Sequence, residues 1–180
     1  VDNDNNTWVY FGTGRYLSKG VDSDEVSTEQ EYLLGIKDPF YNVNYEATTP
    51  VYYEDLAANK ILTSSDLVDS TPFLILDTGS VKWNNGSSFV DPAFSVGGSS
   101  GGAWDFDRLL AYVGENDGWL RKLPIGVTAE KSLNKPAVIG GLTLFTTFSP
   151  KGDVCDYGGS STLWALYYKT GTAFYRAVFQ

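Results

Sequence analysis

The stretch that most constrains the fold runs from residue 142 to residue 171 and reads LTLFTTFSPKGDVCDYGGSSTLWALYYKTG. In residues 142–148 the even-numbered side chains (Leu, Leu, Thr, Phe) would face one side of a pleated strand, and the odd-numbered ones (Thr, Phe, Thr) the other. Pro150 and three glycines then interrupt this alternation. Residues 162–168 are rich in β-branched and aromatic side chains and end in a Lys-Thr-Gly turn signal. The stretch therefore predicts two strands joined by a loop that contains the only cysteine, Cys155.

The rest of the chain repeats short aromatic strands separated by turns. Its 180 residues include 12 Tyr, 10 Phe and 5 Trp, which suit strands that need broad, rigid side chains. The single helix is expected at residues 105–113, where Asp105 is a candidate N-cap, apolar side chains form a stripe and Gly114 follows. We therefore predict an all-β fold with one short helix.

Other elements are expected from the same signals. Strands are predicted at residues 7–12, 31–37, 73–76 and 118–123. Gly140-Gly141 should join residues 136–140 and 142–149 in a hairpin, and residues 162–168 should pair with 174–179 in another. Residues 55–60 should form one helical turn, residues 62–71 a turn capped by Ser65 or Asp66, and residues 84–102 a long surface excursion.

Composition and charge exclude several classes of function. The formal net charge is −9 and the sequence contains no His. Nucleic-acid binding needs Lys and Arg to neutralise phosphates, so no nucleic-acid partner is expected. His is the commonest general base and a common metal ligand, and its absence removes that residue type from both roles. The sequence contains no run of about 18 apolar residues, so no membrane span is predicted. The start at Val1 without a signal peptide indicates a processed product or an excised fragment.

Asp2, Asp4 and Asn6 alternate near the N-terminus as the oxygen ligands of a calcium loop do. An EF-hand loop also needs Gly at its sixth position and Glu at its twelfth. Counted from Asp2, these positions hold Thr7 and Thr13. We therefore favour a tight Asn/Asp turn, with these three side chains as weak candidate metal ligands.

Two features point to contacts with other molecules. An odd cysteine cannot form a disulfide within the chain, so Cys155 is either a candidate for an intermolecular disulfide or an unpaired thiol without a role. Tyr41, Tyr45, Tyr52 and Tyr53 lie in an irregular region, where exposed rings could anchor a protein partner or a glycan. The alternative is that these rings pack beneath the long loop, since aromatic side chains carry much of a core.

Catalysis has little support in the sequence. The two Gly-Gly-Ser-Ser runs lack the Gly-x-Ser-x-Gly spacing of a nucleophile elbow, and no His is present to activate a serine. Neighbouring carboxylates could hydrolyse a glycoside, but each candidate has an ordinary role as a helix cap or a solvated turn. These candidate pairs are Asp105/Asp107, Asp66/Asp69 and Glu115/Asp117. A separate acidic group, Asp22, Asp24 and Glu25, could bind a metal ion, although such loops are usually only solvated. We predict that the chain is not an enzyme.

Short aromatic strands with Gly-rich turns are typical of sandwiches, barrels and propellers. The segment LWALYYKTG at residues 163–171 is similar to a blade motif of quinoprotein-like propellers. Over most of its length the chain resembles the C-terminal propeller domain of the PilY1/PilC family of type IV pilus assembly and tip adhesin proteins. The segments that carry this resemblance are, in order, WVYFGTGRYL, GIKD, LTSSDLVDST, LLAYVGENDGW, AEKSLNKPAVIGG, LTLFTTFSP and GGSSTLWALYYKTG.

The resemblance implies that residues 1–180 are the C-terminal part of a partial β-propeller whose upstream blades are absent from this chain and whose helix lies in a long insertion. It implies a pilus-associated location, extracellular or on the outer membrane, and a role in pilus assembly, adhesion or surface sensing. Expected partners are minor pilins or other pilus subunits, and another chain that covers open strand edges. The family's Asp-rich calcium loop has no match here, so no cofactor is expected. Two alternatives stay open, a quinoprotein-like dehydrogenase propeller and a carbohydrate-binding β module.

Overall fold

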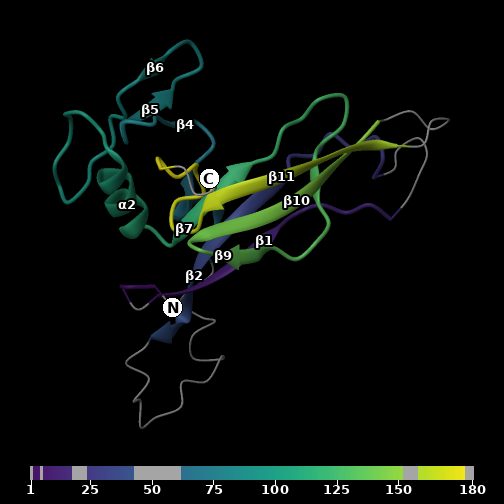
Figure 1. Ribbon diagram of the computed structural model, residues 1–180, viewed down its shortest axis with the longest axis horizontal. Helices are drawn as coiled ribbons and strands as arrows, with labels where there is room; N and C mark the ends of the chain where they lie inside the picture. Colours follow the sequence, from purple (N-terminus) through teal and green to yellow (C-terminus); the bar gives the residue numbers. More distant parts are fainter. Residues whose placement is uncertain (1, 5, 18–23, 43–61, 152–157, 177–180) are drawn as a thin grey trace, which may run out of the picture.

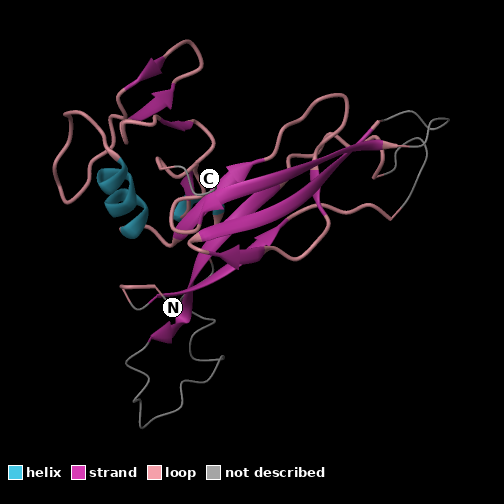
Figure 2. Cartoon of the chain, viewed as in Figure 1, coloured by secondary structure: helices cyan, strands magenta, loops and turns pink. Residues whose placement is uncertain are grey.

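A computed structural model describes residues 2–4, 6–17, 24–42, 62–151 and 158–176. This part of the protein is mostly β, with one α-helix and three open sheets, so the predicted β-rich fold with one short helix is confirmed (Figure 1). Two sheets overlie each other along the long axis of the molecule, and the third sheet lies with the helix at one end (Figure 2). No closed or propeller arrangement is present in the described residues.

The first sheet has the strand order β1-β2-β7-β3. These strands are β1 (Asn6–Gly12), β2 (Tyr32–Asn42), β7 (Gly118–Lys122) and β3 (Val68–Asp69). β2 pairs in antiparallel fashion with both β1 and β7, and β3 pairs with β7 in parallel. The register places Tyr10, Gly35 and Trp119 in one row across the sheet, so these residues share a face.

The second sheet has the order β11-β10-β8, and β9 also pairs with β10. Its strands are β8 (Lys131–Ser132), β9 (Ala137–Ile139), β10 (Leu142–Pro150) and β11 (Gly159–Tyr167). β10 and β11 pair continuously, from Leu142 opposite Tyr167 to Pro150 opposite Gly159. The predicted strand pair is therefore confirmed, and so is the hairpin that joins β9 to β10 at Gly140-Gly141.

The third sheet, β4-β5-β6, lies at the end of the molecule beside the helix (Figure 1). Its strands are β4 (Phe73–Ile75), β5 (Val81–Asn84) and β6 (Phe89–Val90), and the helix is α2 (Phe106–Gly114). Ring contacts join this sheet to the helix through Phe73, Trp83, Phe94, Trp104 and Tyr112. Aromatic packing therefore fills this end of the molecule, and Phe73 and Trp104 belong to the same hydrophobic cluster as Trp119 and Phe145.

Both predicted helical caps are confirmed. Asp105 caps α2 by accepting the backbone N–H of Arg108 at 2.8 Å. In the short 3-10 helix η1 (Ser64–Asp66), Asp66 accepts the backbone N–H of Thr63 at 2.7 Å. Neither of these helices, nor any other in the described ranges, is long and apolar enough to cross a membrane.

Trp119 of β7 is fully buried between the first and second sheets. Its ring meets Phe145 of β10 edge-on, with 6.3 Å between ring centroids, and lies 6.3 Å from the ring of Tyr10. The indole N–H donates a hydrogen bond of 2.9 Å to the carbonyl oxygen of Tyr168, just beyond β11. One tryptophan therefore contacts both sheets and the turn that follows the second one.

The outer faces of this sheet pair are apolar and partly open. On the first sheet, Val9 is 48% exposed and Phe11 is 39% exposed. On the second sheet, Ile139 and Leu163 are each 65% exposed. Side chains alternate along a strand, so these four lie opposite the ones that fill the space between the sheets. The pair therefore presents apolar surface outward on both sides.

The predicted hairpin between residues 162–168 and 174–179 is wrong for the residues that the structure describes. The chain turns at residues 167–172, where the Tyr167 N–H donates to the Thr172 carbonyl at 2.7 Å, and residues 173–176 form no strand. Phe174 instead stacks on Tyr167, with 4.9 Å between ring centroids, and contacts Phe106 of α2 at 5.3 Å. Packing onto the helix therefore overrides the strand pattern. Residues 177–180 and the expected helical turn at 55–60 lie outside the described residues.

Candidate functional site

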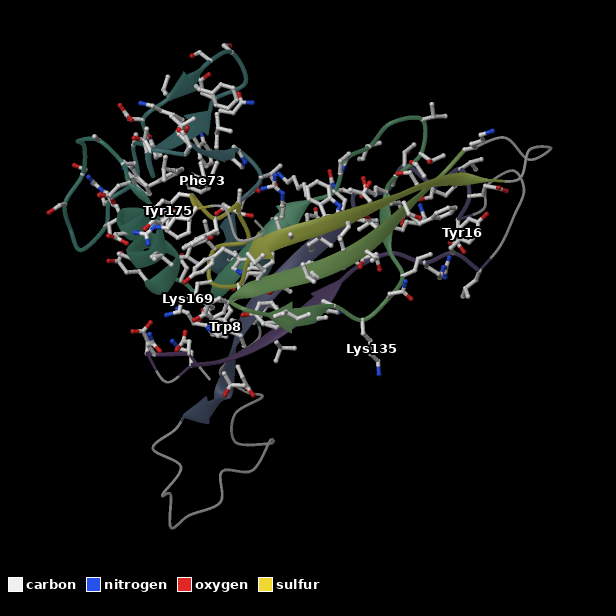
Figure 3. The ribbon with its side chains drawn as sticks, viewed as in Figure 1. Trp8, Tyr16, Phe73, Lys135, Lys169 and Tyr175 are labelled. Carbon is white, nitrogen blue, oxygen red and sulfur yellow. The ribbon has the colours of Figure 1, made fainter. Side chains whose placement is uncertain are left out.

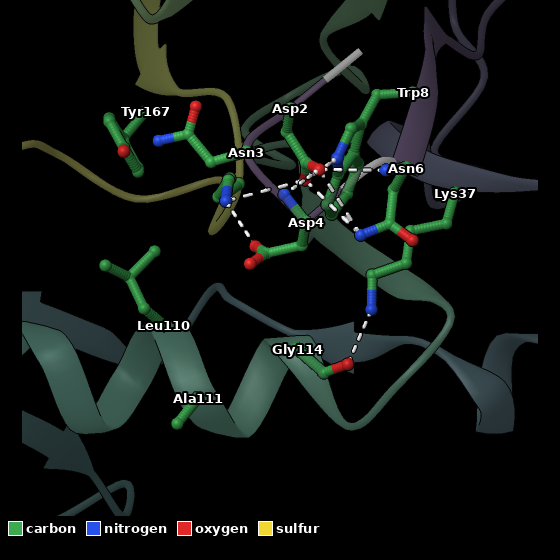
Figure 4. A pocket seen from close by; sticks show the side chains of 11 residues that line it. Asp2, Asn3, Asp4, Asn6, Trp8, Lys37, Leu110, Ala111, Gly114 and Tyr167 are labelled. Atoms are coloured by element: carbon green, nitrogen blue, oxygen red, sulfur yellow. Dashed lines mark hydrogen bonds and ion pairs between the residues drawn. The ribbon is translucent and has the colours of Figure 1, made fainter. Parts of the chain in front are cut away.

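Two open hollows meet at Trp8, at the end of the sheet pair that carries the N-terminal turn. Figure 3 labels Trp8 and Lys169 at this end, and Figure 4 shows the side chains that line the larger hollow. The larger has a volume of about 470 Å³ and is lined by the N-terminal turn, Lys37 of β2, the last turns of α2 and Lys169. The smaller, of about 390 Å³, is lined by side chains of β1, β9 and the turn after β11. Asp2 and Trp8 line both hollows, so they stand between them.

The carboxylate of Asp2 organises the N-terminal turn. It accepts backbone N–H groups from Asp4 and Asn6, each at 2.9 Å, and the indole N–H of Trp8 at 2.8 Å. Burial alone would raise the pKa of Asp2, but these three donors and the nearby ammonium of Lys169 lower the pKa to about 2. Asp2 is therefore a charged anchor that fixes the Trp8 side chain against the turn.

Lys169 closes the turn from the other side. Its ammonium lies 2.7 Å from a carboxylate oxygen of Asp4 and 3.5 Å from one of Asp2. Burial alone would lower the pKa of Lys169, but the hydrogen bond to Asp4 and the charge of Asp2 raise it. Lys169 lies in the turn after β11, so this pair of contacts joins the N-terminus to the second sheet.

Lys37 joins the same hollow to the helix. Its ammonium donates to the carbonyl oxygens of Gly114 and Asn116, each at 2.6 Å, where the carbonyl groups at the end of α2 have no partners within the helix. A positive charge at a helix C-terminus also complements the helix dipole. Burial lowers the pKa of Lys37, and the charge of Asp117 opposes this effect. Lys37 therefore fixes α2 against β2.

An aromatic row forms the floor between the hollows. The rings of Trp8 and Tyr10 are nearly parallel, with 6.1 Å between their centroids. The Tyr10 hydroxyl donates to the carbonyl of Tyr168 at 3.2 Å, and burial raises the pKa of Tyr10. These rings are therefore held by hydrogen bonds at their polar ends and present their apolar surfaces to the space beside them.

A second polar cluster lies between the sheets, at Trp164 of β11. The carboxylate of the buried residue Glu130 accepts the indole N–H of Trp164 at 2.8 Å and also a hydrogen bond from the Thr147 hydroxyl. On the ring face of Trp164, the guanidinium of Arg121 lies 5.5 Å from the ring centroid. Glu130 and Thr147 are both buried, so this cluster positions strands instead of forming an open site.

The sequence-predicted residues divide between the described and the undescribed parts of the chain. Asp2, Asp4 and Asn6 come together in one turn, as expected, and N–H donors occupy the Asp2 carboxylate. The described residues contain no group of three or more His, Cys, Asp or Glu side chains that could hold a metal ion. Tyr41 belongs to β2, and only its backbone is described. Tyr45, Tyr52, Tyr53, Cys155 and Asp22 lie outside the described residues.

Four of the candidate carboxylates that the structure describes have structural contacts. Asp105 and Asp66 are helix caps, and Asp69 forms an ion pair of 2.8 Å with Lys122. Asp24 pairs with Arg15 at 2.9 Å. Sequence reasoning missed Trp8, Lys37 and Lys169 as members of one site. The alternation in TWVYFG places Trp8 and Tyr10 on one face, which is the one signal that could have found part of it.

Replacing Asp2 with Asn should lower the free energy of unfolding by about 2 kcal/mol at pH 7, because a folded-state pKa near 2 stands against about 3.9 in the unfolded chain. A carboxyl group whose pKa is lower in the folded than in the unfolded state stabilises the fold at pH values above its unfolded-state pKa. This stabilisation is lost as the pH falls from about 4 to 2. The difference between wild type and Asp2→Asn in urea unfolding should therefore shrink over that range. The exposed residue Asp77 supplies the control Asp77→Asn, for which little change is expected. A difference that stays constant with pH would contradict the assignment.

The site combines aromatic surface with paired charges, an arrangement that suits binding better than bond chemistry. Comparison with protein-family models, with curated proteins and with solved structures found no match to this chain. Its function therefore has to be argued from its own residues.

Proposed function

We propose that this chain is a binding module of a pilus-associated β-propeller protein at the cell surface, and that it works through protein contacts and not as an enzyme. In this proposal the two overlying sheets correspond to neighbouring blades. Minor pilins or other pilus subunits are the partners, and the role is in pilus assembly, adhesion or surface sensing. The proposal rests on the sequence resemblance together with the surface of the sheet pair.

The single observation that carries it is the apolar character of both outer faces. An antiparallel sheet in a two-layer protein normally packs one face on the core and presents a polar face to water. Here Val9 and Phe11 on one side, and Ile139 and Leu163 on the other, are exposed and apolar. Blades in a propeller stand beside further blades and leave only short edges open. Two sheets with apolar outer faces suit such a stack, or a protein partner in its place.

Several of the segments similar to the pilus family lie in strands of the sheet pair. The WVYFG segment lies in β1, GIKD in β2 and GSSTLWALY in β11. The resemblance therefore concerns the residues that build the two sheets and not only their loops. This coincidence supports a shared architecture with that family.

The charges at the Trp8 hollows favour binding over catalysis. A general base works best when its pKa lies near the operating pH, whereas the pKa of Asp2 is about 2. Both lysines of the larger hollow already bind oxygen atoms, Lys37 at the end of α2 and Lys169 on Asp4. These groups hold the surface in shape and leave no paired acid and base to transfer protons.

The hollows also favour a second candidate function, the binding of a carbohydrate. Sugar rings bind against aromatic side chains, with polar groups at the rim that receive their hydroxyls. Trp8, Tyr10 and Tyr168 supply the aromatic surface, and Asn3 and Asp4 supply polar groups beside it. This candidate uses the end of the sheet pair, whereas the protein-contact proposal uses its outer faces.

The composition of the native complex tests the proposal. We expect this chain to copurify with minor pilins from the cell surface after crosslinking. The variant Phe11→Lys should lose them, because it places a charge on an open apolar face. Val127→Lys is the matched control, since Val127 is 81% exposed in a loop. Recovery as a lone cytoplasmic protein would contradict the proposal, and retention on immobilised glycans without pilins would favour carbohydrate binding.

A further inference from the structure

Strand β11 forms one edge of the second sheet. The sheet order is β11-β10-β8, and within the described ranges no strand pairs with the far side of β11 (Figure 1). Residues 159–163 and Ala165 are exposed. An edge strand presents a row of unpaired N–H and C=O groups, and the chemistry that satisfies them is another extended strand.

The backbone groups on the open side can be assigned. The Tyr168 N–H donates to the Gly141 carbonyl, toward β10, whereas the Tyr167 N–H donates to the Thr172 carbonyl in the turn. Backbone polar groups alternate in direction along a strand, so those of Ala165, Leu163 and Ser161 point away from β10, as those of Tyr167 do. The turn thus closes one end of the edge and leaves these three residues open.

The other edges of the three sheets are short or irregular. β3, β6 and β8 have 2 residues each, and β4 and β9 have 3. β1 carries a register shift between Asn6 and Trp8. β11 has 9 residues, pairs with β10 without a shift, and contains neither Pro nor a charged residue. Proteins usually protect long edges with charges, Pro or bulges, and none of these devices is present in β11.

Charge indicates which partner fits this edge. The chain carries a net charge of −9, so two copies repel each other over most approaches. The second sheet is the exception, because β9, β10 and β11 contain no charged residue and Lys131 of β8 is buried. The first sheet, in contrast, carries charges of both signs, at Lys37, Asp38, Asp69, Arg121 and Lys122. A second copy can therefore meet the β11 edge without bringing like charges together.

We propose that β11 pairs in antiparallel fashion with β11 of a second copy, about a two-fold axis at Leu163. Residue 163 is the midpoint of the strand Gly159–Tyr167 and of the three open residues, so pairing centred there places Leu163 against Leu163 and Ser161 against Ala165. The N–H and C=O groups of these residues face the open side. Each residue is therefore paired with one whose backbone groups also point toward the partner strand. The contact is isologous and closes after two copies. It rests on this edge alone and does not depend on the proposed pilus role.

Sedimentation of the full chain at rising concentration, from micromolar to millimolar, tests this pairing. We expect a reversible dimer for wild type. Leu163→Lys and Leu163→Glu should each weaken dimerisation at least about tenfold, because they place like charges opposite each other at the axis. A mixture of the two variants should dimerise again, since opposite charges then meet. Val127→Lys, which adds the same charge at an exposed loop position, should leave the dimer unchanged.

Amide hydrogen exchange supplies a second measurement that needs no variant. Exchange at Ser161, Leu163 and Ala165 should slow as concentration rises, while exchange at β6 stays unchanged. A wild-type monomer at every concentration would overturn the proposal. So would a dimer that survives both Leu163 variants, or a variant mixture that stays monomeric. None of these results bears on copurification with pilins, so this pairing and the proposed function can fail separately.

Discussion

Replacing Trp119 with alanine is expected to lower the free energy of unfolding by about 3–5 kcal/mol, as other deletions of large buried rings do. Trp119 is fully buried and meets Tyr10 from the first sheet and Phe145 from the second. The substitution would leave a cavity between the sheets and remove the hydrogen bond to Tyr168. A domain of this size is stable by about 5–15 kcal/mol, so one side chain would account for a large share.

Guanidinium unfolding followed by circular dichroism measures this loss. Trp83→Ala is the matched control, because it removes the same side chain from a partly buried position on the third sheet. We expect a smaller loss there, since less surface leaves water when Trp83 packs. Equal losses for the two variants would contradict the central role of Trp119. Trp119→Phe separates the contributions, because it keeps a ring between the sheets and removes the indole donor.

Local sequence signals predicted the elements that depend on local physics. The β9–β10 hairpin follows from two glycines between alternating strands, and both glycines adopt positive φ, of 59° and 84°. Helix α2 follows from its Asp105 cap and its apolar stripe. The turn at Asp2 follows from the preference of Asp and Asn for such positions. In each case the residues that decide the structure lie within a few positions of one another.

The assignment of faces could not be predicted from alternation alone. On β10 the buried inner face carries Thr143, Phe145 and Thr147, and the face with more Leu points outward. Buried hydroxyls are tolerated where they find partners, and the Thr147 hydroxyl has the carboxylate of Glu130. That partner lies outside the strand, so the alternation showed two faces without showing which one is inside.

The candidate site depends on contacts between distant parts of the chain. Asp2 and Lys169 lie at opposite ends of the sequence, and Lys37 reaches the end of α2 near Gly114. Tertiary packing brings these elements together, and no local spacing encodes it. Residues 174–176 do not form the predicted strand for the same reason, because Phe174 packs on α2.

Replacing Gly171 with alanine is expected to lower the free energy of unfolding by about 2–4 kcal/mol, through strain and overlap together. The backbone of Gly171 has φ of 64°, a left-handed conformation that costs about 1 kcal/mol for alanine. A Cβ atom at this position would also overlap the six-membered ring of Trp119. Trp119 is fully buried and cannot move aside freely, so the overlap adds to the conformational cost.

Gly140→Ala separates these two costs. Gly140 has nearly the same backbone angle, with φ of 59°, but a Cβ atom there would meet nothing within 4 Å. Its loss in urea unfolding should be about 1 kcal/mol, and the excess at Gly171 then measures the overlap. In a Trp119→Leu background, which removes the six-membered ring, Gly171→Ala should cost no more than Gly140→Ala. An excess that persists in that background would show that Trp119 is not what requires glycine in the turn after β11.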